Sequence, residues 1–188
     1  MKLFQTLALA LAVTVGSYTA QAQNKKVDAA KSKINWVGKK VTGEHSGTVN
    51  VKDATLVFKG DKLKGGKVVV DMTSLNATDL SGEYQQKLNG HLKADDFFGT
   101  DKYPTATLEF KKIQDKGNGT YTITGDMTIK DVTNSITFDL VVKGNTASSS
   151  LKIDRTKYGI KYGSGSFFDN LGDKTIYDEF ELNVNLMF

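Results

Sequence analysis

From Ile34 onward, the apolar residues of this 188-residue chain mostly recur at every second position. This spacing is typical of strands with one buried face, because successive side chains of a strand point to opposite sides. The pattern predicts a strand that opens with Ile34 and Trp36. It also predicts three short strands, over residues 48–51, residues 56–58 and, after a turn at Gly65 and Gly66, residues 68–72.

The second half of the chain continues as strands and tight turns. Apolar alternation predicts strands over 106–110, 121–129, 136–142, 151–153 and 180–186, and a long loop over 159–174. Turn residues separate the strands at 115–119, 130–131 and 144–145. The last strand is long and regular enough to pair with the first. About eight antiparallel strands favour a closed barrel over a sandwich, because a sandwich leaves edge strands that need protection.

The period changes between residues 78 and 93, where apolar residues fall three or four positions apart. This spacing predicts the one helix of the mature chain, with a face formed by Leu80, Tyr84, Leu88 and His91. Gly82 and Gly90 each weaken the helix by about 1 kcal/mol relative to alanine. We therefore expect the helix to break near Asn89 unless it packs against another part of the protein. Pro104 forbids further helix, and a strand is expected to follow at once.

The N-terminus has the features of a secretory signal peptide. Lys2 precedes an apolar run over 7–15, and the small residues Ala20 and Ala22 form the expected cleavage site. We therefore expect residues 1–22 to be removed and residues 23–188 to form a single domain, exported to the periplasm as a soluble protein without a transmembrane segment. The chain has no cysteine, so neither disulfides nor a lipid-linked cysteine can contribute.

The charge pattern argues against nucleic acid as a partner. The net charge is +4, and it falls to +3 once Lys2 is removed with the signal peptide. Lysines alternate with acidic residues along the chain and form no basic block, which is typical of an ordinary solvated surface. The sequence leaves a homodimer open.

Candidate catalytic groups are sparse. His91, Asp95 and Asp96 lie on or just after the predicted helix and suggest a metal site or an acid–base pair. Only two histidines exist, however, and His45 lies on a separate predicted strand, so we expect these groups to make local hydrogen bonds. No nucleophile elbow, metal-spaced histidine pair or phosphate loop is present. The sequence predicts neither enzyme activity nor a metal or other cofactor, with a hydrolase that uses carboxylates near Asp95 as the weaker alternative.

Three stretches carry a resemblance to a known family. HLKADDFFGTDKYPTATLEF (91–110), GDMTIKDVT (125–133) and IDRTKYGI (153–160) occur in the order and spacing of the YceI family of periplasmic, lipocalin-like polyisoprenoid-binding proteins. The chain departs from the usual pattern at Asp131 and at Asn134 and Ser135, which we expect to belong to turns. The resemblance implies an eight-stranded lipocalin-like barrel with one attached helix. It also implies an interior that holds a polyisoprenoid, an isoprenoid quinone or a similar long-chain lipid. A filled barrel with a structural or stress role is the alternative.

The expected ligand-contacting residues are mostly aromatic. Phe97, Phe98 and Tyr103 form either the mouth of a cavity or a plug beneath the helix, and strand residues line a cavity or fill a core. The full expected lining is Trp36, Phe58, Phe97, Phe98, Tyr103, Leu108, Phe110, Phe138, Leu140 and Phe180. Arg155 is the sole arginine, and its planar fork suits two hydrogen bonds to one anion. We expect it to pair with Asp95 or Asp96, or else with a lipid head group.

Overall fold

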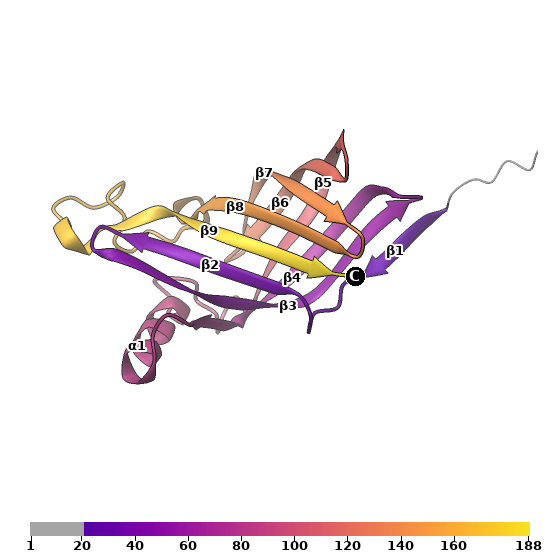
Figure 1. Cartoon of the computed structure of the whole chain (residues 1–188). Helices are drawn as coiled ribbons and strands as arrows, with labels where there is room; N and C mark the ends of the chain where they lie inside the picture. The colour runs from indigo at the N-terminus through magenta and orange to yellow at the C-terminus, as the bar shows by residue number, and fades with distance from the viewer. Residues whose placement is uncertain (1–20) are drawn as a thin grey trace, which may run out of the picture.

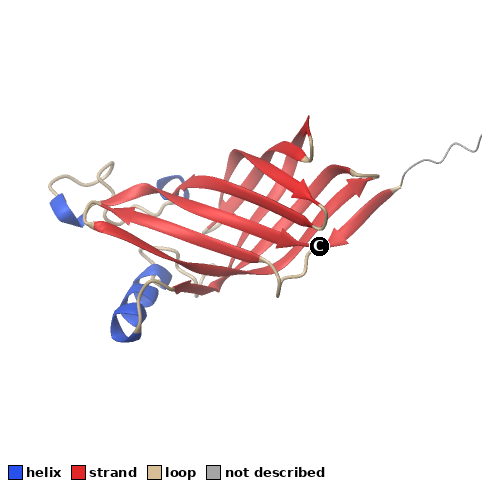
Figure 2. Ribbon diagram, in the orientation of Figure 1, coloured by secondary structure: helices blue, strands red, loops and turns tan. Residues whose placement is uncertain are grey.

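The computed structural model describes residues 21–188, so all but the last two residues of the expected signal peptide lie outside the described residues. Nine strands, one α-helix and two short 3-10 helices make up this part of the chain (Figures 1 and 2). The elements are β1 (Ala22–Lys26), β2 (Lys33–Lys40), β3 (Gly43–Lys59), β4 (Lys62–Ala77), α1 (Gly82–Lys93), β5 (Thr105–Gly117), β6 (Thr120–Ile129), β7 (Val132–Lys143), β8 (Thr146–Asp154), η1 (Arg155–Tyr158), η2 (Gly172–Lys174) and β9 (Ile176–Met187).

Strands β2 to β9 form a closed antiparallel barrel. The order along the sheet is β1-β3-β2-β9-β8-β7-β6-β5-β4, and pairing of β3 with β4 closes it. Strand β9 pairs with β2, with Ile34 opposite Val184, as expected for the terminal strand. The β7–β8 ladder is short and spans three residue pairs. The prediction of an eight-stranded antiparallel barrel with one attached helix is confirmed, and β1 adds a ninth strand beside the second half of β3.

The prediction of separate strands over 48–51 and 56–58 is wrong, because both stretches belong to the 17-residue strand β3. The pairing of β3 with β4 shifts register between Val51 and Asp53. This bulge moves the buried face from odd positions, such as Val49, to even positions, such as Leu56 and Phe58. When the buried positions of a strand change from odd to even numbers halfway along, the alternation in the sequence looks like that of two separate strands.

The expected turn at Gly65 and Gly66 is also wrong. The chain turns at Gly60 and Asp61, and both glycines lie within β4. A Cβ atom at Gly66 would lie 2.6 Å from the ring of Phe110, so glycine is needed here for the close approach of that ring rather than for a turn.

The helix α1 is present, but part of its expected buried face is exposed. Tyr84 is 75% exposed, whereas Leu88 and Leu92 pack against the barrel core. Leu80 precedes the first helical residue and so cannot extend the face. The helix continues through Asn89, whose Oδ1 accepts a hydrogen bond of 2.7 Å from the backbone N–H of Ala77 at the end of β4. Strand β5 begins directly after Pro104, as expected. The expected turn position of Asn134 and Ser135 is wrong, because both lie within β7 and pair with β6.

Candidate ligand cavity

An apolar cavity of about 210 Å³ lies inside the barrel. All eight barrel strands contribute to its wall, because the inward-facing residues of each strand are predominantly aliphatic or aromatic. Helix α1 and the segment after it cover one side through Leu88, Leu92, Phe97 and Phe98. The wall therefore offers a ligand mainly dispersion contacts and very few hydrogen bonds.

One end of the barrel is filled. Phe58 lies against Phe188, with ring centroids 5.4 Å apart, and the Lys25 ammonium group of β1 lies about 5 Å from both rings. The Tyr121 hydroxyl accepts a hydrogen bond from the backbone N–H of Leu63 at the same end. Phe58 was expected to line the cavity, but it belongs to this packed end because it lies near the last residues of β3.

The other end is the mouth of the cavity. Apart from Ser149, the hydrophilic residues that border the cavity come from the end of β2, the start of β3, η1, the start of β9 and the helix. These elements gather at the left of Figure 1, where α1 and the loop of residues 159–175 also lie. The bordering residues are Lys39, Lys40, His45, His91, Arg155, Tyr177 and Glu179.

The structure brings together most of the residues expected to form the lining. The ring centroids of Phe97 and Phe98 lie 5.3 Å apart, edge to face, and those of Phe98 and Phe180 lie 6.1 Å apart. On β5 and β7, the ring centroids of Phe110 and Phe138 also lie 6.1 Å apart. Eight of the ten residues border the cavity, and contact with a ligand stays a prediction for all of them. The eight are Trp36, Phe97, Phe98, Leu108, Phe110, Phe138, Leu140 and Phe180.

Tyr103 does not border the cavity. Its ring packs on Gly99 within the turn between α1 and β5, and its backbone N–H bonds to the Gly99 carbonyl. Sequence reasoning also missed aliphatic wall residues such as Ile34, Val68 and Val70. The same alternation marks them, but their side chains look identical to those of a filled core.

Arg155 makes more hydrogen bonds than any other side chain that borders the mouth. It is 2% exposed and begins η1, directly after β8. Its guanidinium group donates four hydrogen bonds to backbone carbonyls and lies 3.6 Å from the Asp178 carboxylate. Burial lowers the pKa of Arg155, while Asp178 and Asp154 oppose that shift. The four carbonyls belong to Tyr177 (3.1 Å), Ile160 (3.0 Å), Tyr162 (2.9 Å) and Ile176 (2.9 Å).

The expected pairing of Arg155 with Asp95 or Asp96 is therefore wrong. Asp95 instead bonds to Lys102, and Lys130 donates to the Asp95 carbonyl. The guanidinium group ties the two ends of the 159–175 loop together, because Ile160 and Tyr162 lie at the start of that loop and Ile176 and Tyr177 directly follow it.

The other polar groups near the cavity do not form a reactive cluster. The expected local hydrogen bond of His91 is absent, since its buried Nε2 has no partner among residues 21–188 and its ring packs edge to face on Phe97 and Tyr162. His45 Nδ1 lies 2.7 Å from Asp79. Burial raises the pKa of the Asp79 carboxyl, but hydrogen bonds from His45 and the Ser46 N–H outweigh it and the net shift is downward. Over residues 21–188, no group of three or more His, Cys, Asp or Glu residues is placed to hold a metal ion.

The fold and the cavity together define a lipocalin-like barrel, with eight antiparallel strands, one helix and an apolar interior. A model of the YceI-like domain matches residues 26–188, and the chain belongs to this family. A UPF0312 protein of Vibrio parahaemolyticus is 35% identical over 148 residues, which cover 73% of this chain and 71% of that protein.

Solved structures share the architecture at lower identity. BcnA of Burkholderia cenocepacia superposes with a TM-score of 0.65 and 24% identity, over 86% of this chain and 99% of that one. A polyisoprenoid binding domain from Saccharophagus degradans, implicated in plant cell wall breakdown, superposes with a TM-score of 0.59 and 16% identity, over 89% of this chain and 97% of that one. At these identities the likeness shows the fold. Within residues 21–188, no helix has the length and apolar character needed to cross a bilayer.

Proposed function

We propose that this protein binds a long apolar molecule in the barrel and carries or sequesters it. A polyisoprenoid, an isoprenoid quinone or a similar lipid is the ligand class. The supporting observation is the cavity itself, whose wall is built almost wholly from aliphatic and aromatic side chains. Such a wall stabilises a hydrocarbon chain by removing it from water and gives no partners to a polar one. The description of the Saccharophagus degradans domain as polyisoprenoid binding supports the same class.

The size of the cavity favours a slender ligand. Its volume of about 210 Å³ lies below the range of roughly 300–1,000 Å³ for drug-sized pockets. A single unbranched or isoprenoid chain fits this small volume better than a bulky ring system. A polar head would then lie at the mouth, because the filled end at Phe58 and Phe188 leaves no exit there.

The compartment forms part of the same proposal. The features of residues 1–22 support export to the periplasm, where a lipid that moves between membranes needs an aqueous carrier. A binding role rather than catalysis is supported by the family and by the dispersed polar groups around the cavity.

Native mass spectrometry of protein purified without detergent tests the function. A carrier should retain an adduct of lipid mass, and solvent extraction should then identify it. Trp36 gives a second measurement, because it is the only tryptophan and it borders the cavity. Titration with a long-chain isoprenoid alcohol should change its fluorescence to saturation. Protein that is empty as purified and shows no saturable change would overturn the proposal.

A further inference from the structure

Exposed hydrophobic side chains gather at the mouth of the cavity. Over residues 21–188, nine large hydrophobic residues are exposed, and five of them lie on the β2–β3 turn, the 159–175 loop and the start of β9. We call this set the mouth rim. It consists of Val41 (51% exposed), Tyr162 (46%), Phe167 (47%), Phe168 (51%) and Tyr177 (50%).

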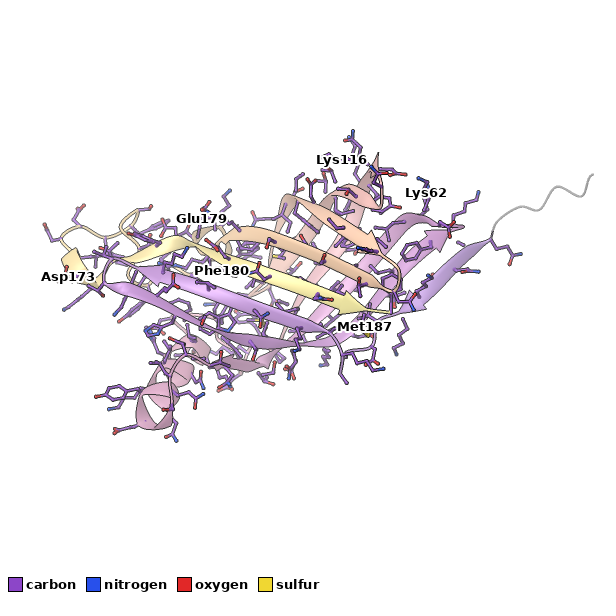
Figure 3. All side chains as sticks on the ribbon, viewed as in Figure 1. Lys62, Lys116, Asp173, Glu179, Phe180 and Met187 are labelled. Carbon is purple, nitrogen blue, oxygen red and sulfur yellow. The ribbon has the colours of Figure 1, made fainter. Side chains whose placement is uncertain are left out.

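Backbone and side-chain bonds hold the mouth rim outward. The N–H groups of Phe167 and Phe168 both donate to the Ser164 carbonyl, which fixes the two rings at the tip of the loop. Ser166 bonds to Asp178, and the N–H of Val41 bonds to the Thr175 carbonyl. Figure 3 places the loop, marked by Asp173, at the end of the barrel opposite Met187. The Phe167 and Phe168 rings thus remain half-exposed at a fixed place on the loop.

The charges around the mouth rim are nearly balanced. Lys40, Lys161 and Lys174 lie among Asp169, Asp173 and Glu179 in the same segments. The Lys161 ammonium group lies 4.5 Å from the Phe167 ring centroid. Aromatic rings with lysines beside them are typical of side chains at a membrane–water interface. Balanced charge indicates that the apolar rings, not anionic lipids, would supply the attraction.

We propose that the mouth rim docks onto the head-group region of a lipid bilayer, so that the ligand passes between bilayer and cavity without crossing water. This inference rests on the proposed function. Each methylene exposed to water lowers the concentration of free ligand about fourfold, so escape of a long chain through water is very slow. The mouth rim lies at the end of the barrel where polar residues border the cavity, and its Tyr177 is itself part of the cavity wall. A bilayer is a partner that itself dissolves such a chain. A bilayer therefore fits this surface better than a second folded protein.

The test measures, by co-flotation, how strongly wild type, a rim variant and a matched control variant bind phosphatidylcholine vesicles. The rim variant carries Phe167→Ser and Phe168→Ser, and the matched control carries Val141→Ser and Met187→Ser. The control residues are also exposed, at 42% and 37%, but lie near the β7–β8 turn and the C-terminus. We expect the rim variant to bind vesicles about tenfold more weakly than wild type and the control to bind equally. Raising the salt concentration should leave wild-type binding nearly unchanged, because the rim charges balance.

A second measurement separates this inference from the proposed function. Transfer of a tritium-labelled isoprenoid alcohol from vesicles to protein should slow about tenfold in the rim variant, while equilibrium retention of the alcohol stays at the wild-type level. A wild type that retains the alcohol but never floats with vesicles would overturn bilayer docking alone. A wild type that floats but retains nothing would support docking and overturn the carrier function. If the rim residues instead hold two copies together, sedimentation would show a dimer that the rim variant loses, and docking would be overturned.

Discussion

At the residue scale, Arg155 shows how one side chain can organise a loop. Its guanidinium group meets carbonyls at the start of the 159–175 loop and directly after its end, and its donors point along fixed directions in one plane. Lysine has a single ammonium group and cannot reach carbonyls spread around the plane. The choice of the only arginine in a lysine-rich chain therefore follows from geometry.

Replacement of Arg155 with lysine should lower the free energy of unfolding by about 2–4 kcal/mol. The variant keeps a buried charge and loses most of four hydrogen bonds, each worth about 1 kcal/mol or somewhat more. Urea denaturation measures the loss. Lys157→Arg, at an exposed position of the same 3-10 helix, should change the value by less than about 0.5 kcal/mol. Folded Arg155→Lys protein should still retain ligand. Unchanged stability together with lost ligand would place Arg155 in the binding site instead.

At the element scale, polar side chains attach the helix to the barrel. Asn89 accepts from the Ala77 N–H and donates to Asn76 Oδ1 at 2.8 Å, while Gln85 donates to the Ala77 carbonyl at 2.7 Å. These bonds satisfy backbone groups at the end of β4 that have no further strand partner. They hold α1 over the cavity although Gly90 in its interior weakens it, whereas Gly82 begins the helix at a positive φ of 59° that favours glycine.

Asn89→Ala should destabilise the protein by about 1–3 kcal/mol, because it leaves the N–H of the buried Ala77 unsatisfied. Gln86→Ala is the control, since Gln86 is exposed on the same helix and should have little effect. Hydrogen exchange gives a local measurement. The amides of α1 should exchange faster in Asn89→Ala, and protection equal to wild type would show that apolar packing alone holds the helix.

The start of β9 should respond to acid through Asp178. Burial raises the pKa of this carboxyl, but the nearby Ser164 hydroxyl, the hydrogen bond from Ser166 and the charge of Arg155 outweigh burial, so the pKa of Asp178 is lowered from its usual value. A carboxyl with a lowered folded-state pKa contributes stability that is complete above its unfolded pKa and is lost as the pH falls through the folded value. Thermal unfolding between pH 6 and pH 3 measures this. Below about pH 4, the melting temperature of wild type should fall further than that of Asp178→Asn. Parallel plots of melting temperature against pH would show that Asp178 does not cause the acid sensitivity.

At the scale of the whole molecule, closure of the barrel creates the cavity. No single strand has a binding surface, since the wall needs inward residues from eight strands, and packing of Phe58 against Phe188 leaves one open end. The proposed binding function therefore depends on the volume that remains inside the closed sheet, and a side chain that occupies this volume should compete with a ligand.

Val70→Trp should reduce ligand retention severalfold, because Val70 borders the cavity and the larger ring occupies it. Val69→Trp is a matched control, since neighbouring residues of a strand face opposite sides and Val69 is not part of the cavity wall. Retention is measured by native mass spectrometry, with circular dichroism to confirm folding. Equal retention in both variants would show that the ligand binds elsewhere.

The sequence alone determined the local architecture. Alternation marked strands such as residues 136–142, turn residues such as Asp131 marked their ends, and Pro104 marked the start of β5, because each depends on neighbours in the chain. Three stretches in order, beginning with the one from His91, were enough to indicate the family. Only the tertiary structure decided the rest. The bulge between Val51 and Asp53, the carbonyls that Arg155 binds, and the separation of cavity wall from filled core all depend on strands that meet across the closed barrel. Contacts between distant segments leave no periodic trace in sequence, since a leucine in a cavity wall and a leucine in a packed core satisfy the same local pattern.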